Sequence, residues 1–175
     1  MPVDPELEIS NLWKQLHGVQ DASKRSFFVW RQVALALAGP EAKPLDIMLK
    51  AWEAQGKDAA KSFFPRLRWD KKKGEQGFML DVARLYATAW ARDGAVVKVE
   101  KGSNPNEVFL KWERCPWPSF ADEYESNMEE DVQGCEKYLQ TILADVNVFM
   151  NTNLKLETQK TIARGQGVCL RRLYI

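Results

Sequence analysis

Apolar residues in the first half of the chain recur every three or four positions, the spacing that one face of an α-helix produces. The clearest case is residues 75–93, where Phe78, Val82 and Leu85 share one face and Gly94 follows as a stop signal. Residues 24–38 are apolar on most sides, as in a buried helix. The predicted helices span residues 5–17, 24–38, 44–56 and 75–93, with a short helix that ends before Pro65.

The pattern changes after Gly94, where β-branched and aromatic residues flank turns rich in glycine, asparagine and proline. It predicts one hairpin from residues 95–100 and 108–115 and a second from residues 153–163 and 168–175. Between them, apolar residues in steps of three and four predict a long helix over residues 119–149.

Helices segregated from antiparallel strands are typical of an α+β fold. We expect one domain over residues 1–175, with a helical half at about 1–94 and a sheet-plus-helix half at about 95–175. In the second half, two hairpins joined by the long helix form a four-stranded antiparallel sheet that packs with the N-terminal helices. No sustained heptad, low-complexity tract or internal repeat is evident.

Charge and composition narrow the classes of partner. The 25 basic and 24 acidic residues give a formal charge of +1, so we expect no nucleic-acid binding. No run approaches the roughly 18 apolar residues of a membrane span, and residues 1–10 lack the pattern of a secretory signal. An odd number of cysteines, three, favours free thiols in a reducing compartment. We therefore predict a cytoplasmic protein that binds a small molecule and no membrane.

The cysteines are the main candidates for chemistry, because all three fall in the sheet-plus-helix half. Cys115 ends a predicted strand, Cys135 lies on the inner face of the long helix, and Cys169 begins the last strand. One interpretation is that they are small buried apolar residues. The other is that they converge as a nucleophile or as soft ligands for a metal such as zinc, with manganese as an alternative. A fourth ligand would come from His17, Asp131, Glu136 or water.

Charged residues near the cysteines suggest supporting roles. Asp131 precedes Cys135 by four residues, so both can share one helix face, where the carboxylate would act as a general base but raise the thiol pKa. The arginines of the last turn, Arg164 above all, could hold a carboxylate, or they could simply be surface residues. His17, the single histidine, is expected to stabilise a helix C-terminus before Gly18.

The stretch "RCPW", then Cys135 on a helix, then "NTNLKLETQKTIARGQGVCLRR" resembles the L-2-amino-thiazoline-4-carboxylic acid hydrolase-like family over about residues 110–175. The resemblance implies an α+β fold akin to the 4-vinyl reductase-type small-molecule-binding domain, in whose sensor relatives cysteines can bind zinc. It implies hydrolytic opening of a thiazoline ring that carries a carboxylate. The matching positions are Cys115, Cys135, Asn151 or Asn153, Gly165 or Gly167, and Cys169. This chain has "CPW" where a histidine often lies near the first cysteine.

Three functions follow. In the first, the chain is a small-molecule hydrolase in which Cys135, Cys169 and Asp131 are catalytic. Its substrate would be bound by Arg164, Trp117, Asn151 and Asn153. In the second, it is a non-catalytic small-molecule or zinc-binding domain that uses Cys115, Cys135 and Cys169. In the third, an exposed Trp117 anchors a partner, such as a second copy in a homodimer. No phosphate loop, dinucleotide fingerprint, HExxH or GxSxG motif is present.

Overall fold

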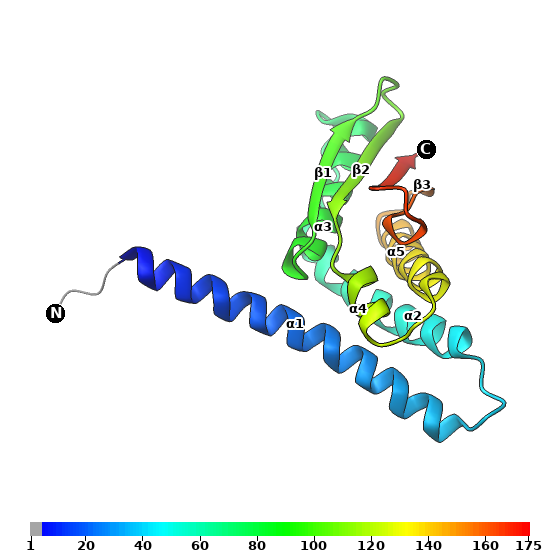
Figure 1. Ribbon diagram of the computed structural model, residues 1–175. Helices are drawn as coiled ribbons and strands as arrows, with labels where there is room; N and C mark the ends of the chain where they lie inside the picture. The colour runs from blue at the N-terminus through cyan, green and yellow to red at the C-terminus, as the bar shows by residue number, and fades with distance from the viewer. Residues whose placement is uncertain (1–4) are drawn as a thin grey trace.

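The computed structural model describes residues 5–175 (Figure 1). The expectation that residues 1–10 are not a signal peptide rests partly on residues 1–4, which lie outside the described residues. The elements are α1 (Pro5–Ala38), α2 (Pro44–Phe63), the 3-10 turn η1 (Phe64–Arg66), α3 (Gly74–Arg92), β1 (Val96–Lys101), β2 (Glu107–Arg114), α4 (Trp117–Glu123), α5 (Met128–Met150), β3 (Lys155–Lys160), the 3-10 turn η2 (Ile162–Arg164) and β4 (Cys169–Tyr174).

The four strands form one antiparallel sheet in the order β1-β2-β4-β3. Each predicted hairpin is present, and β2 pairs with β4 to join the two, so the α+β prediction is confirmed. In this register Trp112 lies opposite Cys169 and Leu110 lies opposite Arg171. Alternation along a strand places both pairs on the buried face of the sheet.

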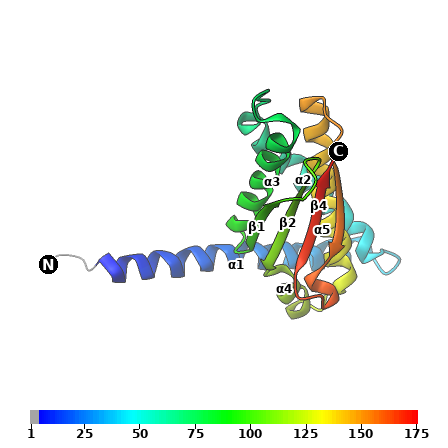
Figure 2. The same cartoon turned by 90° about the horizontal axis from the view of Figure 1, so that it is seen from above.

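Helices cover one face of the sheet and leave the other open (Figure 2). Helices α3 and α5 contact the strands, and α2 packs along α5. Helix α1 crosses the outside of this body, and its first half projects away from it (Figure 1). Within residues 5–175 no helix combines the length and the apolarity that a membrane span needs.

The helical half contains fewer and longer helices than the sequence pattern predicts. Residues 5–38 form one helix, so the predicted break at Gly18 is wrong, and His17 lies in mid-helix, stacked on Trp13 with ring centroids 6.0 Å apart. Helix α2 likewise runs through Gly56, so the predicted stop there is wrong. A Cβ at this position would lie 2.9 Å from the Tyr138 carbonyl oxygen on α5, so only glycine allows the two helices to approach this closely. Glycine is used at this position for close packing, which outweighs its low helix propensity.

The predicted helix over residues 119–149 is two helices, α4 and α5. The break falls where Asn127 caps α5, its side-chain Oδ1 accepting a 2.8 Å hydrogen bond from the Glu129 backbone N–H. The preceding Glu125 adopts a left-handed conformation with φ of 52°, which a continuing helix does not allow. The apolar spacing continues across Asn127, but the asparagine cap starts a new helix there.

We expect Gly134→Ala to destabilise the protein by about 1–3 kcal/mol, since overpacked cores lose stability on this scale. Gly134 lies on α5 against α2, and a Cβ there would overlap the Trp52 indole. Gly18→Ala is the matched control, because a Cβ at Gly18 meets no heavy atom within 4 Å. Urea unfolding measures both. Equal stabilities for the two variants would contradict the close α2–α5 contact.

Candidate functional site

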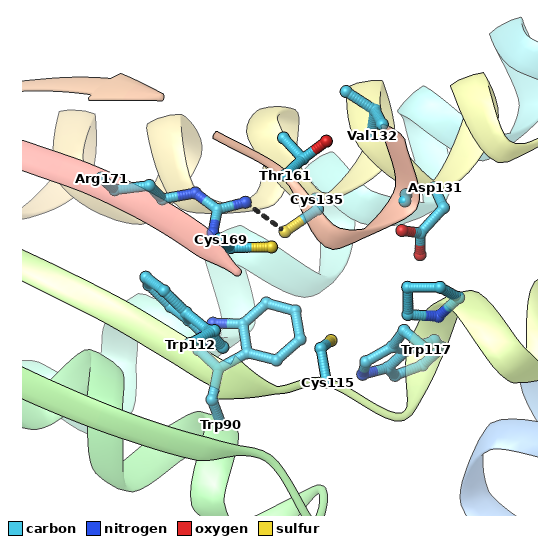
Figure 3. A pocket seen from close by; sticks show the side chains of 12 residues that line it. Trp90, Trp112, Cys115, Trp117, Asp131, Val132, Cys135, Thr161, Cys169 and Arg171 are labelled. Atoms are coloured by element: carbon cyan, nitrogen blue, oxygen red, sulfur yellow. Dashed lines mark hydrogen bonds between the residues drawn. The ribbon is translucent and has the colours of Figure 1, made fainter. Parts of the chain in front are cut away.

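A narrow cavity lies between α5, the ends of β2 and β4, and the start of α4 (Figure 3). Its empty space, including the mouth, is about 350 Å³, but the centre of a water molecule can reach only about 20 Å³ of it. That is room for about one water molecule. Tryptophans form much of the wall: Trp90 from α3, Trp112 from β2 and Trp117 from α4.

All three cysteines line this cavity, as the convergence hypothesis requires. Cys115 is in the bend between β2 and α4, Cys135 is on α5, and Cys169 begins β4. None forms a disulfide. Asp131, one helical turn before Cys135, lines the same space (Figure 3).

Arg171 supplies the positive charge of the site. It lies two residues after Cys169 on β4, so strand alternation turns both side chains inward, and its residue is only 3% exposed. Its Nη2 donates a 3.0 Å hydrogen bond to Cys135 Sγ, and its guanidinium carbon lies 4.5 Å from the centre of the Trp112 ring. Its Nε is buried without a hydrogen-bond partner. Burying an unpaired donor is costly, so this atom is unusual in a folded protein.

Other polar atoms of the wall differ in how they are satisfied. Cys169 Sγ accepts a 3.2 Å hydrogen bond from the Ile162 backbone N–H, which fixes its direction. By contrast, Trp90 Nε1 and Thr161 Oγ1 are buried without partners. Two residues of the cavity wall thus carry polar atoms without hydrogen-bond partners.

Burial sets the protonation states. It raises the pKa of Cys135 to about 12, although the Arg171 guanidinium opposes the shift. It also raises the pKa of Asp131 to about 6, again against the attraction of Arg171. The pKa of Cys115 is raised well above its usual value, first by burial and then by the neighbouring Cys135. At neutral pH both of these thiols are therefore protonated, while Asp131 is mostly ionised.

The donor set does not fit a metal centre. Among residues 5–175, no group of three or more histidine, cysteine, aspartate or glutamate side chains is arranged to hold a metal ion. In addition, Arg171 donates to the Cys135 sulfur, and a positive charge at that sulfur disfavours a bound cation. The predicted site of Cys115, Cys135 and Cys169 has no support from this geometry, for zinc or for manganese.

Several predicted binding residues lie elsewhere. Arg164 is exposed and pairs with Glu129 at 2.9 Å, outside the cavity. Asn151 and Asn153 border a separate hollow beyond the far end of α5, where Asn151 is the left-handed C-cap of that helix. Trp117 does line the cavity, but it is only 6% exposed, so the prediction of an exposed anchor is wrong.

Asp131→Asn should stabilise the protein at neutral pH. The carboxyl pKa is 3.8 in its ordinary state and about 6 in the fold, so folding disfavours the ionised form. The cost is fully present above pH 6 and disappears as pH falls below about 4. Asp131→Asn should therefore raise the free energy of unfolding by between about 1 and 3 kcal/mol at pH 7.5, a range that allows for solvent screening at a partly exposed group.

Urea unfolding of wild type and Asp131→Asn at several pH values measures this difference. Asp122→Asn, at an exposed position of α4, is the control and should change little. If the stability difference between wild type and Asp131→Asn does not shrink as the pH is lowered from 7.5 to 4, the pKa of Asp131 is not raised by the fold.

Comparison with known proteins identifies a family. The family model described as L-2-amino-thiazoline-4-carboxylic acid hydrolase matches residues 22–173, which include every residue of the cavity named above. No curated protein and no solved structure matches the chain.

Proposed function

Because the chain belongs to the L-2-amino-thiazoline-4-carboxylic acid hydrolase family, we propose that it hydrolyses a small thiazoline-like ring that bears a carboxylate. The observation that carries the proposal is the Cys135 sulfur, which Arg171 contacts and which shares the cavity with Asp131. A nucleophile, a base and a cation in one apolar pocket are the components that hydrolytic covalent catalysis requires.

The proposed reaction begins at the ring carbon that is bonded to both nitrogen and sulfur. Cys135 Sγ attacks this carbon while Asp131 takes the thiol proton. The bond from the carbon to the ring sulfur then breaks, and Asp131 returns the proton to that sulfur. Water then adds to the carbon while Asp131 takes one of its protons, and Asp131 passes that proton to Cys135 Sγ as the bond from carbon to Cys135 breaks; the second water proton goes to the ring nitrogen. The net change consumes one water: its oxygen becomes a carbonyl, and its hydrogens end on the ring nitrogen and sulfur.

Arg171 is proposed to hold the substrate carboxylate. Its Nε is a buried donor without a partner, while Nη2 keeps its contact with Cys135. A guanidinium can make both contacts because its donors point along different edges of one plane. This replaces the carboxylate role predicted for Arg164, which lies outside the cavity. We propose that Cys169 helps to position Arg171 and that Trp117 forms the outer wall.

Substrate entry requires the cavity to widen, because its free volume accommodates about one water molecule and no ring. One part of the wall is formed by Cys115, which lies between β2 and α4, and by Trp117 and Pro118, which begin α4. We propose that this segment moves outward when the ring binds.

The test is incubation of the purified chain with 2-amino-thiazoline-4-carboxylate in ¹⁸O-labelled water, with and without added zinc or manganese. We expect a ring-opened product with one labelled oxygen and a free thiol, formed faster than in a protein-free blank. Absence of turnover in every condition would refute the hydrolase. If calorimetry then showed binding of the same compound, the chain would be a non-catalytic binding domain.

Two arginine variants test the carboxylate contact. Arg171→Lys should raise KM at least tenfold, because lysine cannot make the two contacts at once. Arg172→Lys is the matched control, since Arg172 is adjacent on β4 but pairs with Glu107 at 2.8 Å on the other face. If Arg164→Ala raised KM instead, the exposed arginine would be the anchor.

A further inference from the structure

Helix α1 carries most of the large apolar side chains that are exposed among residues 5–175. Ten of the fifteen large apolar side chains exposed in residues 5–175 belong to it, and each is at least 45% exposed. Single exposed apolar residues are ordinary, but a contiguous row of them marks an interaction surface.

The row follows a heptad pattern over the whole helix, so the expectation that the chain has no sustained heptad is wrong for residues 9–37. Ile9, Leu12, Leu16 and Val19 lie on the first half, in steps of three and four. The same steps continue through Ser23 and Ser26 to Trp30, Val33 and Leu37. We call these nine residues the α1 seam. Alternating steps of three and four are the spacing by which helices pair along their length.

The seam is separate from the face that α1 uses inside the protein. The buried residues of α1 are Gln20, Lys24, Phe27, Phe28 and Arg31. At 100° per residue, this buried face lies roughly a third of a turn from the seam. Residues 5–19 are all exposed, and this half of α1 projects from the body (Figure 1).

We propose that the α1 seam binds a second copy of this chain, as an antiparallel helix pair with its two-fold axis close to Ser23. In this register Leu16 lies beside Trp30 of the second copy, Leu12 beside Val33, and Ile9 beside Leu37. Each contact occurs twice, as a closed two-fold interface requires. The projecting half of each copy thereby covers the exposed half of the seam that lies next to the body of the other.

The charges that flank the seam are compatible with self-association, and those at the helix ends favour an antiparallel pair. Of the residues at the two flanking heptad positions, only Glu8 is charged, so no like charges face each other across the pair. An antiparallel pair also separates the two acidic first turns, which contain Glu6 and Glu8, and sets the helix dipoles in opposition. Serine at the centre is small enough to let the helices approach closely.

The buried area is that of a stable dimer. If about 50 Å² of each of the seven apolar side chains of the seam is covered, two copies of α1 bury roughly 700 Å² of apolar surface. This is about the apolar share of an interface of roughly 1,200 Å², the lower end of the range for stable complexes.

The charged residues of α1 argue against a membrane surface as the binding partner of the α1 seam. Helices that lie on membranes have polar faces rich in lysine and arginine. Residues 5–19 contain two glutamates and one such residue, Lys14. A second copy of the chain satisfies the apolar row without needing a basic face.

The interface would adjoin the cysteine cavity. A groove of about 490 Å³ between α1 and α2 is lined by Trp30, Ala51, Ala54 and Trp117. Trp117 also lines the cysteine cavity, so it separates the two spaces. The projecting half of the second copy, which lies beside Trp30, covers this groove from outside.

Light scattering after size exclusion, over a micromolar concentration series of the full chain, tests the proposal. Wild type should have a mass of about 40 kDa, twice the 20.1 kDa of the chain. Leu16→Glu should raise the dimer Kd at least tenfold. Lys14→Glu is the control: it makes a larger charge change on the far side of the helix and should leave the Kd unchanged.

The outcomes decide the proposal. A wild type that stays monomeric overturns it, whether or not the chain then floats with phosphatidylcholine and phosphatidylserine vesicles. A dimer that Leu16→Glu does not weaken excludes the seam. At a concentration low enough to keep both variants monomeric, circular dichroism should show the same melting transition for Leu16→Glu and Lys14→Glu, since residues 5–19 are all exposed.

Cysteine cross-linking tests whether the two α1 helices of the dimer run antiparallel. Mixed Leu12→Cys and Val33→Cys proteins should form a disulfide between the two variants on mild oxidation, with wild type as the control for the native thiols. A Leu12→Cys protein that cross-links to itself instead would show a parallel pair and overturn the antiparallel arrangement.

Discussion

Cys135→Ser is expected to lower kcat toward the carboxylated thiazoline by at least about a thousandfold, with KM changed by no more than about threefold. A hydroxyl is a much weaker nucleophile than a thiol when both depend on the same base. The substitution is nearly isosteric, so binding should survive. Steady-state kinetics measures both constants.

The two pKa values show why Asp131 must act in the same step as the attack. The Cys135 pKa is about 12 and the Asp131 pKa is about 6. Moving the proton to the carboxylate before attack would cost on the order of 8 kcal/mol. Concerted transfer avoids this cost, because the new bond to carbon forms as the proton leaves. The kcat/KM should therefore rise through a pH of about 6 and then level off, as the base ionises.

Cys115→Ser is the comparison within the same cavity. Cys115 also lines the cavity, but Arg171 makes its hydrogen bond to Cys135. We expect a loss of less than about tenfold for this variant, since it changes the wall and not the nucleophile. Cys135→Ser that kept more than a tenth of wild-type kcat would indicate direct attack by water. Asp131 would then remain the base.

Hydrophobic spacing predicted the kinds of element and the sheet but not the helix ends. Gly18 and Gly56 look like stops in the sequence, yet both lie inside helices. At Gly56 the reason is the nearby α5 backbone, a contact that local sequence does not encode. Dividing α1 at Gly18 also divides the heptad row into two short stripes. The row becomes visible only when the helix is continuous.

The cavity was partly predictable, because spacing and strand alternation carry some of its geometry. Cys115, Cys135 and Cys169 were expected to converge if the helix packed on the sheet, and they line one cavity. Arg171, and not the predicted Arg164, lines this cavity. Alternation from Cys169 contained the needed signal: Cys169, Arg171 and Leu173 fall on one face of β4, and all three are buried. Trp90 could not be assigned, because its position depends on how α3 packs against β2.

Arg31→Ala should destabilise the fold by about 3–5 kcal/mol, because it leaves a buried carboxylate without its partner. Arg31 Nε donates to Glu130 Oε2 at 2.8 Å and Nη2 donates to Glu130 Oε1 at 2.7 Å. Both side chains are less than a tenth exposed. Urea unfolding measures the loss. Arg25→Ala is the matched control on the same helix: its contact with Glu123 is 3.9 Å long and exposed, so its loss should be under about 1 kcal/mol.

The same pair connects stability to the cavity, because Glu130 precedes Asp131 on α5. Arg31→Met combined with Glu130→Met removes both charges and should be less destabilising than Arg31→Ala alone. A double variant as unstable as the single one would mean that packing, and not the unpaired charge, causes the loss. Since the pair fixes the first turn of α5 against α1, Arg31→Ala should also lower kcat through misplacement of Asp131, while Arg25→Ala should not.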